Sequence, residues 1–189
     1  MLTAVFCWIM AATFKAHAQT RINFSFDSGL SWVPYQDSLT ENLPKFYYGG
    51  AIGTSFFSDK KLNVETKIGL NAKGWRFTNF DDSKGTMRLS YIGSEVFGVY
   101  NINSKIKTQA GVNVQYLLKV KRLPDFATIV PNYTKYDISI LLGVSYRLNR
   151  LLSIGVNYNH GQVQLLDKSI TGLDNFKNRS LFVRVTYDL

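Results

Sequence analysis

Large apolar side chains alternate with small or polar ones along the segment RINFSFDSGLSW, from Arg21 to Trp32. Ile22, Phe24 and Phe26 share one parity, and such a period of two predicts a strand with one apolar and one polar face. The alternation returns in seven further segments, which are 46–56, 62–71, 87–100, 106–118, 136–148, 152–159 and 181–189. These strands must pair with one another, and their apolar faces must meet either a protein core or lipid.

The weakest alternation lies in segment 87–100, where the two parities mix. We expect the larger apolar set of this segment to share the apolar face of the other strands, and this set is Leu89, Tyr91, Phe97 and Val99. Ile92 and Val96 fall on the opposite parity, and Glu95 falls on the apolar one. This mixture predicts a bulge or a change of register.

Long and short connections alternate between the predicted strands. The long ones are 33–45, 78–86, 120–135 and 160–178, and the short ones are 58–61, 101–105 and 149–150. Membrane barrels need strands of about 9 to 11 residues, with short turns on the periplasmic side and long loops outside. The predicted fold is therefore all-β, an eight-stranded antiparallel up-and-down transmembrane β-barrel with both termini in the periplasm.

The composition of the two faces favours lipid over a protein core. The polar parity is rich in small residues, as a narrow lumen requires, including Gly49, Gly53, Gly69, Gly111, Gly143 and Gly155. The apolar parity carries aromatic residues near the strand ends, where amphipathic rings suit the membrane interfaces, including Trp32, Tyr48, Tyr116, Tyr136, Tyr146, Tyr158 and Tyr187. A soluble barrel of the lipocalin type would instead cover its outer face with long charged side chains.

The first 18 residues have the features of a signal peptide. A short apolar run ends in Ala16, His17 and Ala18, which is the small-x-small pattern of a cleavage site. We expect residues 1–18 to be removed together with Cys7, and residues 19–189 to form one barrel domain. The net charge is +9, but basic residues are spread over many segments of an exported chain, so we expect no nucleic-acid partner.

Charged residues on the polar parity predict a charge network in the lumen. Its members are Asp27, Glu65, Lys67, Lys73, Lys107, Lys119, Asp137, Arg147, Arg184 and Asp188. Buried charges are tolerated when they are paired, and eight strands enclose space only for their own side chains, so we expect ion pairs to close the lumen. The surplus of Lys and Arg in this set suggests the alternative of a small anion-biased pore.

Two segments resemble the outer-membrane β-barrel family of the Bacteroidota often described as PorT-like. KNRSLFVRVTYDL, from Lys177 to Leu189, resembles the closing strand of that family, and YIGSEVFGVYNI, from Tyr91 to Ile102, is similar to a middle strand. The chain departs from the family at Leu189, where an aromatic final residue is usual. The resemblance covers the whole chain after the signal peptide and implies an architecture without a specific chemistry, although some members assist protein secretion or gliding.

No residue set predicts catalysis or cofactor binding, so we expect a protein that is not an enzyme. His160 is the only histidine after the signal peptide. It falls on the apolar parity and Ser180 on the polar one, so a nucleophile and its base would point to opposite faces. A lipid-modifying enzyme is therefore only the third hypothesis, after the scaffold and the pore. A lone histidine without cysteine does not predict a metal site. We expect an outer-membrane scaffold or interaction protein, with membrane lipid, the barrel assembly machinery and a protein at the loops as partners.

Overall fold

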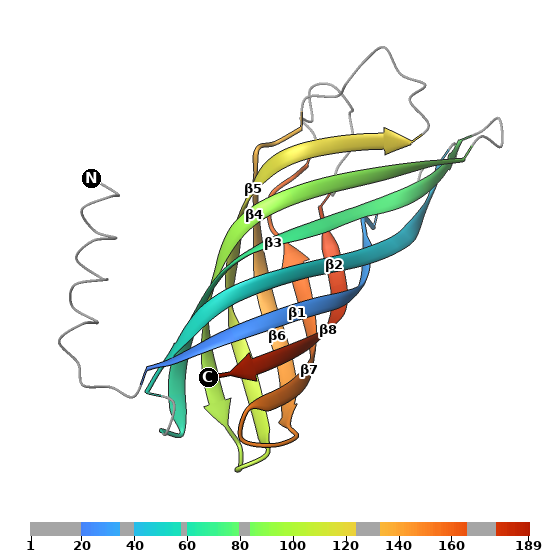
Figure 1. The fold of residues 1–189 in the computed structure, drawn as a ribbon. Helices are drawn as coiled ribbons and strands as arrows, with labels where there is room; N and C mark the ends of the chain where they lie inside the picture. The colour runs from blue at the N-terminus through green and yellow to red at the C-terminus, as the bar shows by residue number, and fades with distance from the viewer. Residues whose placement is uncertain (1–19, 35–39, 58–59, 80–83, 124–132, 166–176) are drawn as a thin grey trace, which may run out of the picture.

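A computed structural model describes residues 20–34, 40–57, 60–79, 84–123, 133–165 and 177–189, so the expected signal peptide lies outside the described residues. Eight strands follow one another (Figure 1), and they are β1 (Arg21–Trp32), β2 (Thr40–Phe56), β3 (Leu62–Asn79), β4 (Lys84–Asn101), β5 (Ile106–Leu123), β6 (Tyr136–Arg147), β7 (Leu152–Gly161) and β8 (Arg179–Asp188). Among these residues, no helix has the length and apolar character needed to cross a membrane.

The sheet closes on itself into a barrel. Each strand pairs antiparallel with the next one along the chain, and β1 pairs with both β2 and β8. Asp27 on β1 therefore lies opposite Gly49 on one side and Arg184 on the other. Closure pairs the backbone groups of the barrel wall internally, as a membrane requires. The predicted eight-stranded antiparallel meander is confirmed.

Apolar side chains cover the outside of the barrel wall. On β6, the side chains of Ile140, Leu142 and Val144 are 45%, 51% and 53% exposed, whereas Ser139 is 1% exposed and points into the interior. A soluble barrel would bury the apolar set instead. The exposed apolar band is the surface that hydrocarbon covers in a transmembrane barrel.

Strand β4 differs from the prediction, because its larger apolar set faces inward. The buried side chains of β4 include Leu89, Tyr91, Phe97 and Val99, while Ile92 and Val96 are exposed. Glu95 explains this orientation, since it shares its parity with Phe97 and pairs inside the barrel with Arg184. A carboxylate turned toward lipid would be costly, so the charge of Glu95 outweighs the apolar count in setting which face is inside.

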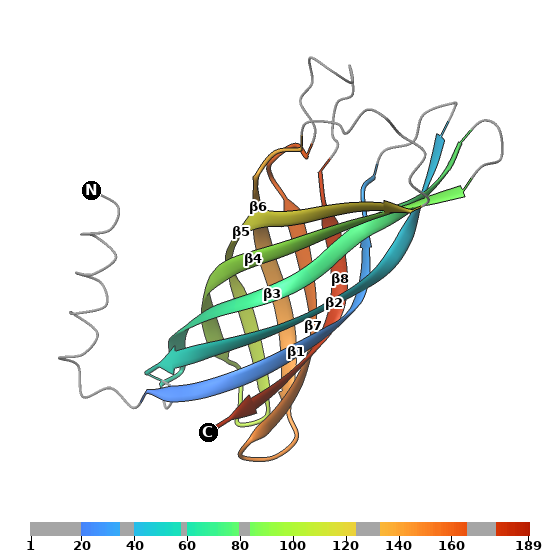
Figure 2. The same cartoon turned by 45° about the horizontal axis from the view of Figure 1, so that its top comes forward.

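Strands β2 to β5 are longer than a membrane crossing needs. They have 17 or 18 residues, whereas β1, β6, β7 and β8 have 10 to 12. Their extra length projects beyond the barrel at the end of the long connections (Figures 1 and 2). The loop expected at 78–86 is shorter than predicted, because β3 continues to Asn79 and β4 begins at Lys84. The expected loops 33–45 and 120–135 likewise contain the ends of β2 and β5.

An apolar cluster packs across the interior at this same end. Its buried members are Val33, Trp75, Phe77, Met87, Leu89, Tyr91 and Leu165, and Leu117, Val120 and Tyr133 pack against them. Val33 follows β1 and Leu165 follows β7, so the cluster joins segments from several sides of the barrel. The mouth of the lumen at the long-connection end is therefore filled by apolar side chains.

Candidate functional site

Arg184 forms the centre of a charge layer in the middle of the lumen. Its Nε and Nη2 atoms donate hydrogen bonds to the two carboxylate oxygens of Asp27, at 2.7 and 2.8 Å. Nη1 and Nη2 donate to the two oxygens of Glu95, at 2.7 and 3.0 Å. Asp27 is on the neighbouring strand β1, but Glu95 is on β4, so a single guanidinium bridges strands that are not paired with each other. Its planar array of N–H donors makes this double bidentate contact possible.

Neutral side chains complete the surroundings of this bridge. The Tyr47 hydroxyl donates to Asp27 over 3.3 Å, and the Asn113 amide donates to Glu95 over 3.2 Å. The guanidinium lies 5.3 Å from the centre of the Phe182 ring, and that ring lies 4.9 Å from the ring of Tyr47. Burial of these three charges is tolerated because each charge has an ionic partner and further hydrogen bonds.

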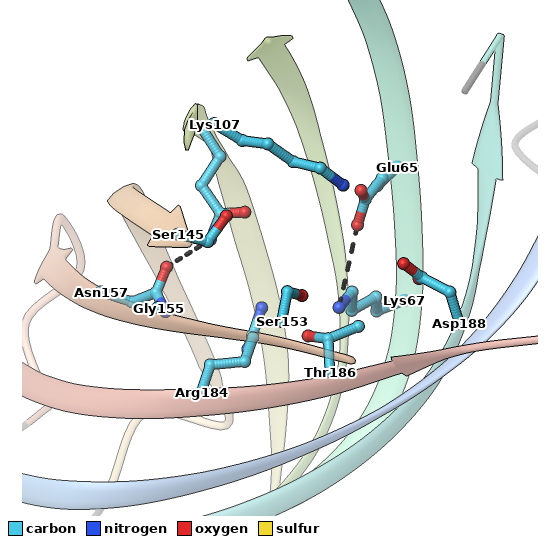
Figure 3. A pocket seen from close by; sticks show the side chains of 11 residues that line it. Glu65, Lys67, Lys107, Ser145, Ser153, Gly155, Asn157, Arg184, Thr186 and Asp188 are labelled. Carbon is cyan, nitrogen blue, oxygen red and sulfur yellow. Dashed lines mark hydrogen bonds and ion pairs between the residues drawn. The ribbon is translucent and has the colours of Figure 1, made fainter. Parts of the chain in front are cut away.

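A second group of charges lies between the bridge and the short turns. Lys67 Nζ is 3.8 Å from the Glu65 carboxylate and 5.6 Å from the centre of the Phe97 ring. Figure 3 shows Lys107 and Asp188 beside this pair, around a cavity of about 20 Å³ that Arg184 also lines. A cavity of this size holds about one water molecule. A further cavity of about 10 Å³ lies on the opposite side of the bridge, next to Asp27 and Glu95.

A third group lies toward the apolar cluster. Lys73 Nζ is 3.0 Å from the Asp137 carboxylate, and both side chains are 1% exposed. The Asn178 amide donates to the same carboxylate over 3.0 Å and to the Tyr91 hydroxyl over 3.3 Å. Tyr91 also belongs to the apolar cluster, so the charge layers and the apolar layer are in direct contact along the barrel axis.

The structure brings most of the sequence-predicted lumen residues together in the interior. The buried ones are Asp27, Glu65, Lys67, Lys73, Asp137 and Arg184. Lys107, Arg147 and Asp188 are partly buried on the same inner face, near the short turns. Lys119 differs: its side chain is exposed on the outside. The register between β4 and β5 shifts at this point, where Tyr91 pairs with Leu117 and Ser90 with Lys119, and the extra residue Leu118 inverts the parity beyond it.

Glu95 is a member of the inner charge layer that the sequence prediction left out. It is the only charged residue of β4 between Leu89 and Asn101, within a strand whose other face carries Ile92 and Val96. The cost of placing a carboxylate against lipid could have identified it, because a single acidic residue in a membrane strand is expected to face the lumen.

The buried charges do not show the predicted basic surplus. In the described part of the chain, the buried acids are Asp27, Glu65, Glu95 and Asp137, and the buried bases are Lys67, Lys73 and Arg184. With the partly buried Lys107, Arg147 and Asp188 included, the predicted set holds five bases and five acids once Glu95 takes the place of Lys119. Among these described residues the interior carries no surplus of basic side chains.

His160 and Ser180 do not form a nucleophile and base pair. The Nδ1 atom of His160 lies 3.2 Å from the Tyr158 hydroxyl, and His160 is opposite Arg179 in the β7–β8 register. Ser180 is the next residue along β8, so its side chain points to the other face, where it is 1% exposed. In the described ranges, no three His, Cys, Asp or Glu side chains lie together in a way that could hold a metal ion.

Comparisons with known proteins support the barrel fold. The family model described as "Outer membrane protein beta-barrel domain" matches residues 15–165. Neisserial surface protein A is 11% identical with a TM-score of 0.53, and the alignment covers 89% of this chain and 96% of that chain. At this identity the likeness bears on the fold alone.

Two other solved barrels are similar at lower scores. The outer membrane protein OprG from Pseudomonas aeruginosa is 12% identical, with a TM-score of 0.49 and coverage of 90% of this chain and 94% of that chain. The Ail protein of Yersinia pestis is 12% identical, with a TM-score of 0.47 and coverage of 91% and 99%. No curated protein matches the sequence.

Proposed function

The chain belongs to the outer membrane protein β-barrel domain family, and on that premise we propose that it acts as a scaffold or interaction protein with a closed lumen. In this proposal the barrel holds its long connections at the cell surface, where a protein partner binds them. The observation that carries the closed lumen is the bridge from Arg184 to both Asp27 and Glu95 across the interior.

The energetics of the bridge support a permanent closure. An ion that passed the bridge would have to separate buried charges from their partners, and removing one partner of a buried pair costs about 3 to 5 kcal/mol. The apolar cluster around Leu89 adds a second barrier at the long-connection end, because apolar constrictions exclude water. Transport would require both layers to rearrange, whereas display of loops requires neither to move.

The proposal includes an orientation and a route of assembly. The ends of β2 and β3, of β4 and β5, and of β6 and β7 that the short connections join lie at one end of the barrel, as they do at the periplasmic turns of outer-membrane barrels, and this supports periplasmic termini. The signal peptide 1–18, insertion of the 19–189 domain by the barrel assembly machinery and kinship with the PorT-like group belong to the same proposal. The closing-strand motif from Lys177 to Leu189 supports that kinship.

Planar-bilayer conductance tests the closed lumen against the pore. The folded protein is purified and added to bilayers of neutral lipid, with a barrel porin as positive control. We expect no discrete current steps from the unaltered protein. Discrete steps that change size in Lys107→Gln or Arg147→Gln would overturn the closed lumen in favour of a small pore. In-cell crosslinking from the long connections, compared with crosslinking from the short turns, then tests whether a partner binds the loop end.

A further inference from the structure

Four basic residues form a patch on the outer face of the extension made by β3, β4 and β5. This basic patch consists of Arg76, Arg88, Lys119 and Lys121. In the register Arg88 lies directly opposite Lys121, Lys119 opposite Ser90, and Arg76 opposite Thr86. Arg76, Lys119 and Lys121 are exposed and Arg88 is partly buried. The patch therefore presents four positive charges on three adjacent strands.

Of the carboxylates whose side chains the structure describes, none pairs with the basic patch. The ion pairs of Asp27, Glu65, Glu95 and Asp137 all lie inside the barrel. Arg76 Nε donates to the backbone oxygen of Pro44 over 3.0 Å, the Arg88 guanidinium lies 5.9 Å from the centre of the Tyr48 ring, and Arg88 Nε is buried without a hydrogen-bond partner. Like charges directly opposite each other on paired strands are destabilising, so the pair of Arg88 and Lys121 favours an anion from outside the described residues.

The patch begins where the apolar outer band ends. Leu70, Ile92 and Leu118 are the exposed apolar side chains of β3, β4 and β5 that come next toward the barrel wall. The basic side chains thus lie at the height where the polar headgroups of a membrane begin. The register between β5 and β6 ends at Tyr116, so Lys119 and Lys121 lie on a free edge of the extension, where lysine protects against edge-to-edge pairing. Arg76 and Arg88 have a paired strand on both sides, so edge protection does not account for them.

We propose that the basic patch binds the phosphate-bearing headgroup of a membrane lipid. The two arginines supply planar N–H arrays that match phosphate oxygens, the two lysines add charge, and the acyl chains extend along the apolar band below. The inner face of the same strands packs in the apolar cluster through Trp75, Met87 and Leu89. The proposal rests on the membrane placement of the proposed function and does not depend on whether the lumen conducts.

Lipid binding is measured on the folded full-length protein in neutral detergent by native mass spectrometry. The probes are dioleoyl phosphatidic acid, which has a phosphate monoester headgroup, and dioleoyl phosphatidylcholine, which has the same acyl chains. One variant replaces the patch residues by glutamine (R76Q, R88Q, K119Q and K121Q). A matched variant removes the same charge from exposed residues of the short turns (K60Q, K61Q, K105Q and R150Q). Heat-modifiable gel mobility verifies that both variants are folded.

We expect the unaltered protein to prefer phosphatidic acid over phosphatidylcholine. The patch variant should weaken the tightest phosphatidic acid binding at least tenfold, because its four charges converge on one headgroup. The turn variant should change this binding less than threefold, since its charges lie on three separate turns. Equal weakening in both variants would show attraction to net charge only and overturn the proposal. Patch-dependent binding of a soluble sulfated polysaccharide without patch-dependent lipid binding would overturn it in favour of a glycan ligand.

Conductance of the same protein preparation separates this proposal from the proposed function. A barrel that does not conduct and shows no lipid selectivity would refute headgroup binding by the basic patch and leave the closed lumen standing. A conducting barrel with patch-dependent lipid binding would refute the closed lumen alone.

Discussion

The guanidinium of Arg184 on β8 lies 2.7 Å from the carboxylate of Glu95 on β4, although these strands are not neighbours in the sheet. The contact crosses the lumen, and it makes Arg184 the residue on which both buried acids of the central layer depend.

Replacing Arg184 by methionine should destabilise the barrel strongly. The change leaves Asp27 and Glu95 buried without their cation, and breaking a buried pair in this way costs about 3 to 5 kcal/mol. The measurement is urea unfolding of the protein in lipid vesicles, followed by tryptophan fluorescence and gel mobility. A loss below about 1 kcal/mol would mean that water screens the bridge and that the lumen is open.

A triple variant separates unpaired charge from lost packing. Arg184→Met combined with Asp27→Asn and Glu95→Gln removes the bridge without leaving buried charges. We expect it to recover a large part of the stability that Arg184→Met alone loses, because neutral isosteres of a buried ion pair are often tolerated. A triple variant less stable than the single one would contradict this explanation.

Leu142→Arg tests the lipid contact of the outer face. Leu142 is 51% exposed near the middle of β6, so arginine there meets hydrocarbon and should cost about 2 to 4 kcal/mol. The matched change Leu148→Arg lies just beyond β6 at a short turn and should cost about 0 to 1 kcal/mol. Urea unfolding in vesicles measures both. Similar losses at the two positions would argue against a hydrocarbon band centred on Leu142.

Gly74→Ala should be much more costly than Gly98→Ala. The φ angle of Gly74 is +153°, and a Cβ atom there would collide with the backbone oxygen of Met87. We expect a loss of about 1 to 3 kcal/mol from this strained position. At Gly98 the nearest atom to a Cβ would be the Ala110 oxygen at 3.9 Å, so alanine fits and its effect should stay near zero. Equal unfolding free energies for the two variants would be inconsistent with the close approach at Gly74.

The strand pattern was predictable from the sequence because alternation is a local property. β1, β6 and β8 each keep one parity along their whole length, so Phe26, Leu142 and Val185 are exposed as their parity indicates. The alternation of connection lengths also correctly indicated a meander, although the ends of β2 to β5 are strand where loops were expected.

The inner charge layer was only partly predictable because it depends on register. A single extra residue at Leu118 turns Lys119 outward, and the only local sign of it is the pair of adjacent leucines at 117 and 118. For β4 the count of apolar residues predicted the wrong outer face. Tyr91 and Phe97 fill the interior, and Glu95 contacts Arg184 on β8, which is distant in the sequence. Such a long-range pairing becomes visible only when the barrel is closed.

Accessibility of single cysteines tests the central claim most directly, namely that the apolar face contacts lipid around a closed polar interior. Ile140→Cys, Leu142→Cys and Val144→Cys are made in protein that lacks Cys7, with Leu151→Cys in a short turn as the water-exposed control. In the folded, membrane-inserted protein, we predict that the three β6 cysteines react with a thiol probe dissolved in the bilayer and are shielded from a water-soluble maleimide, while the control reacts with the maleimide. Reaction of the β6 cysteines with the water-soluble maleimide would contradict the assignment of the two faces.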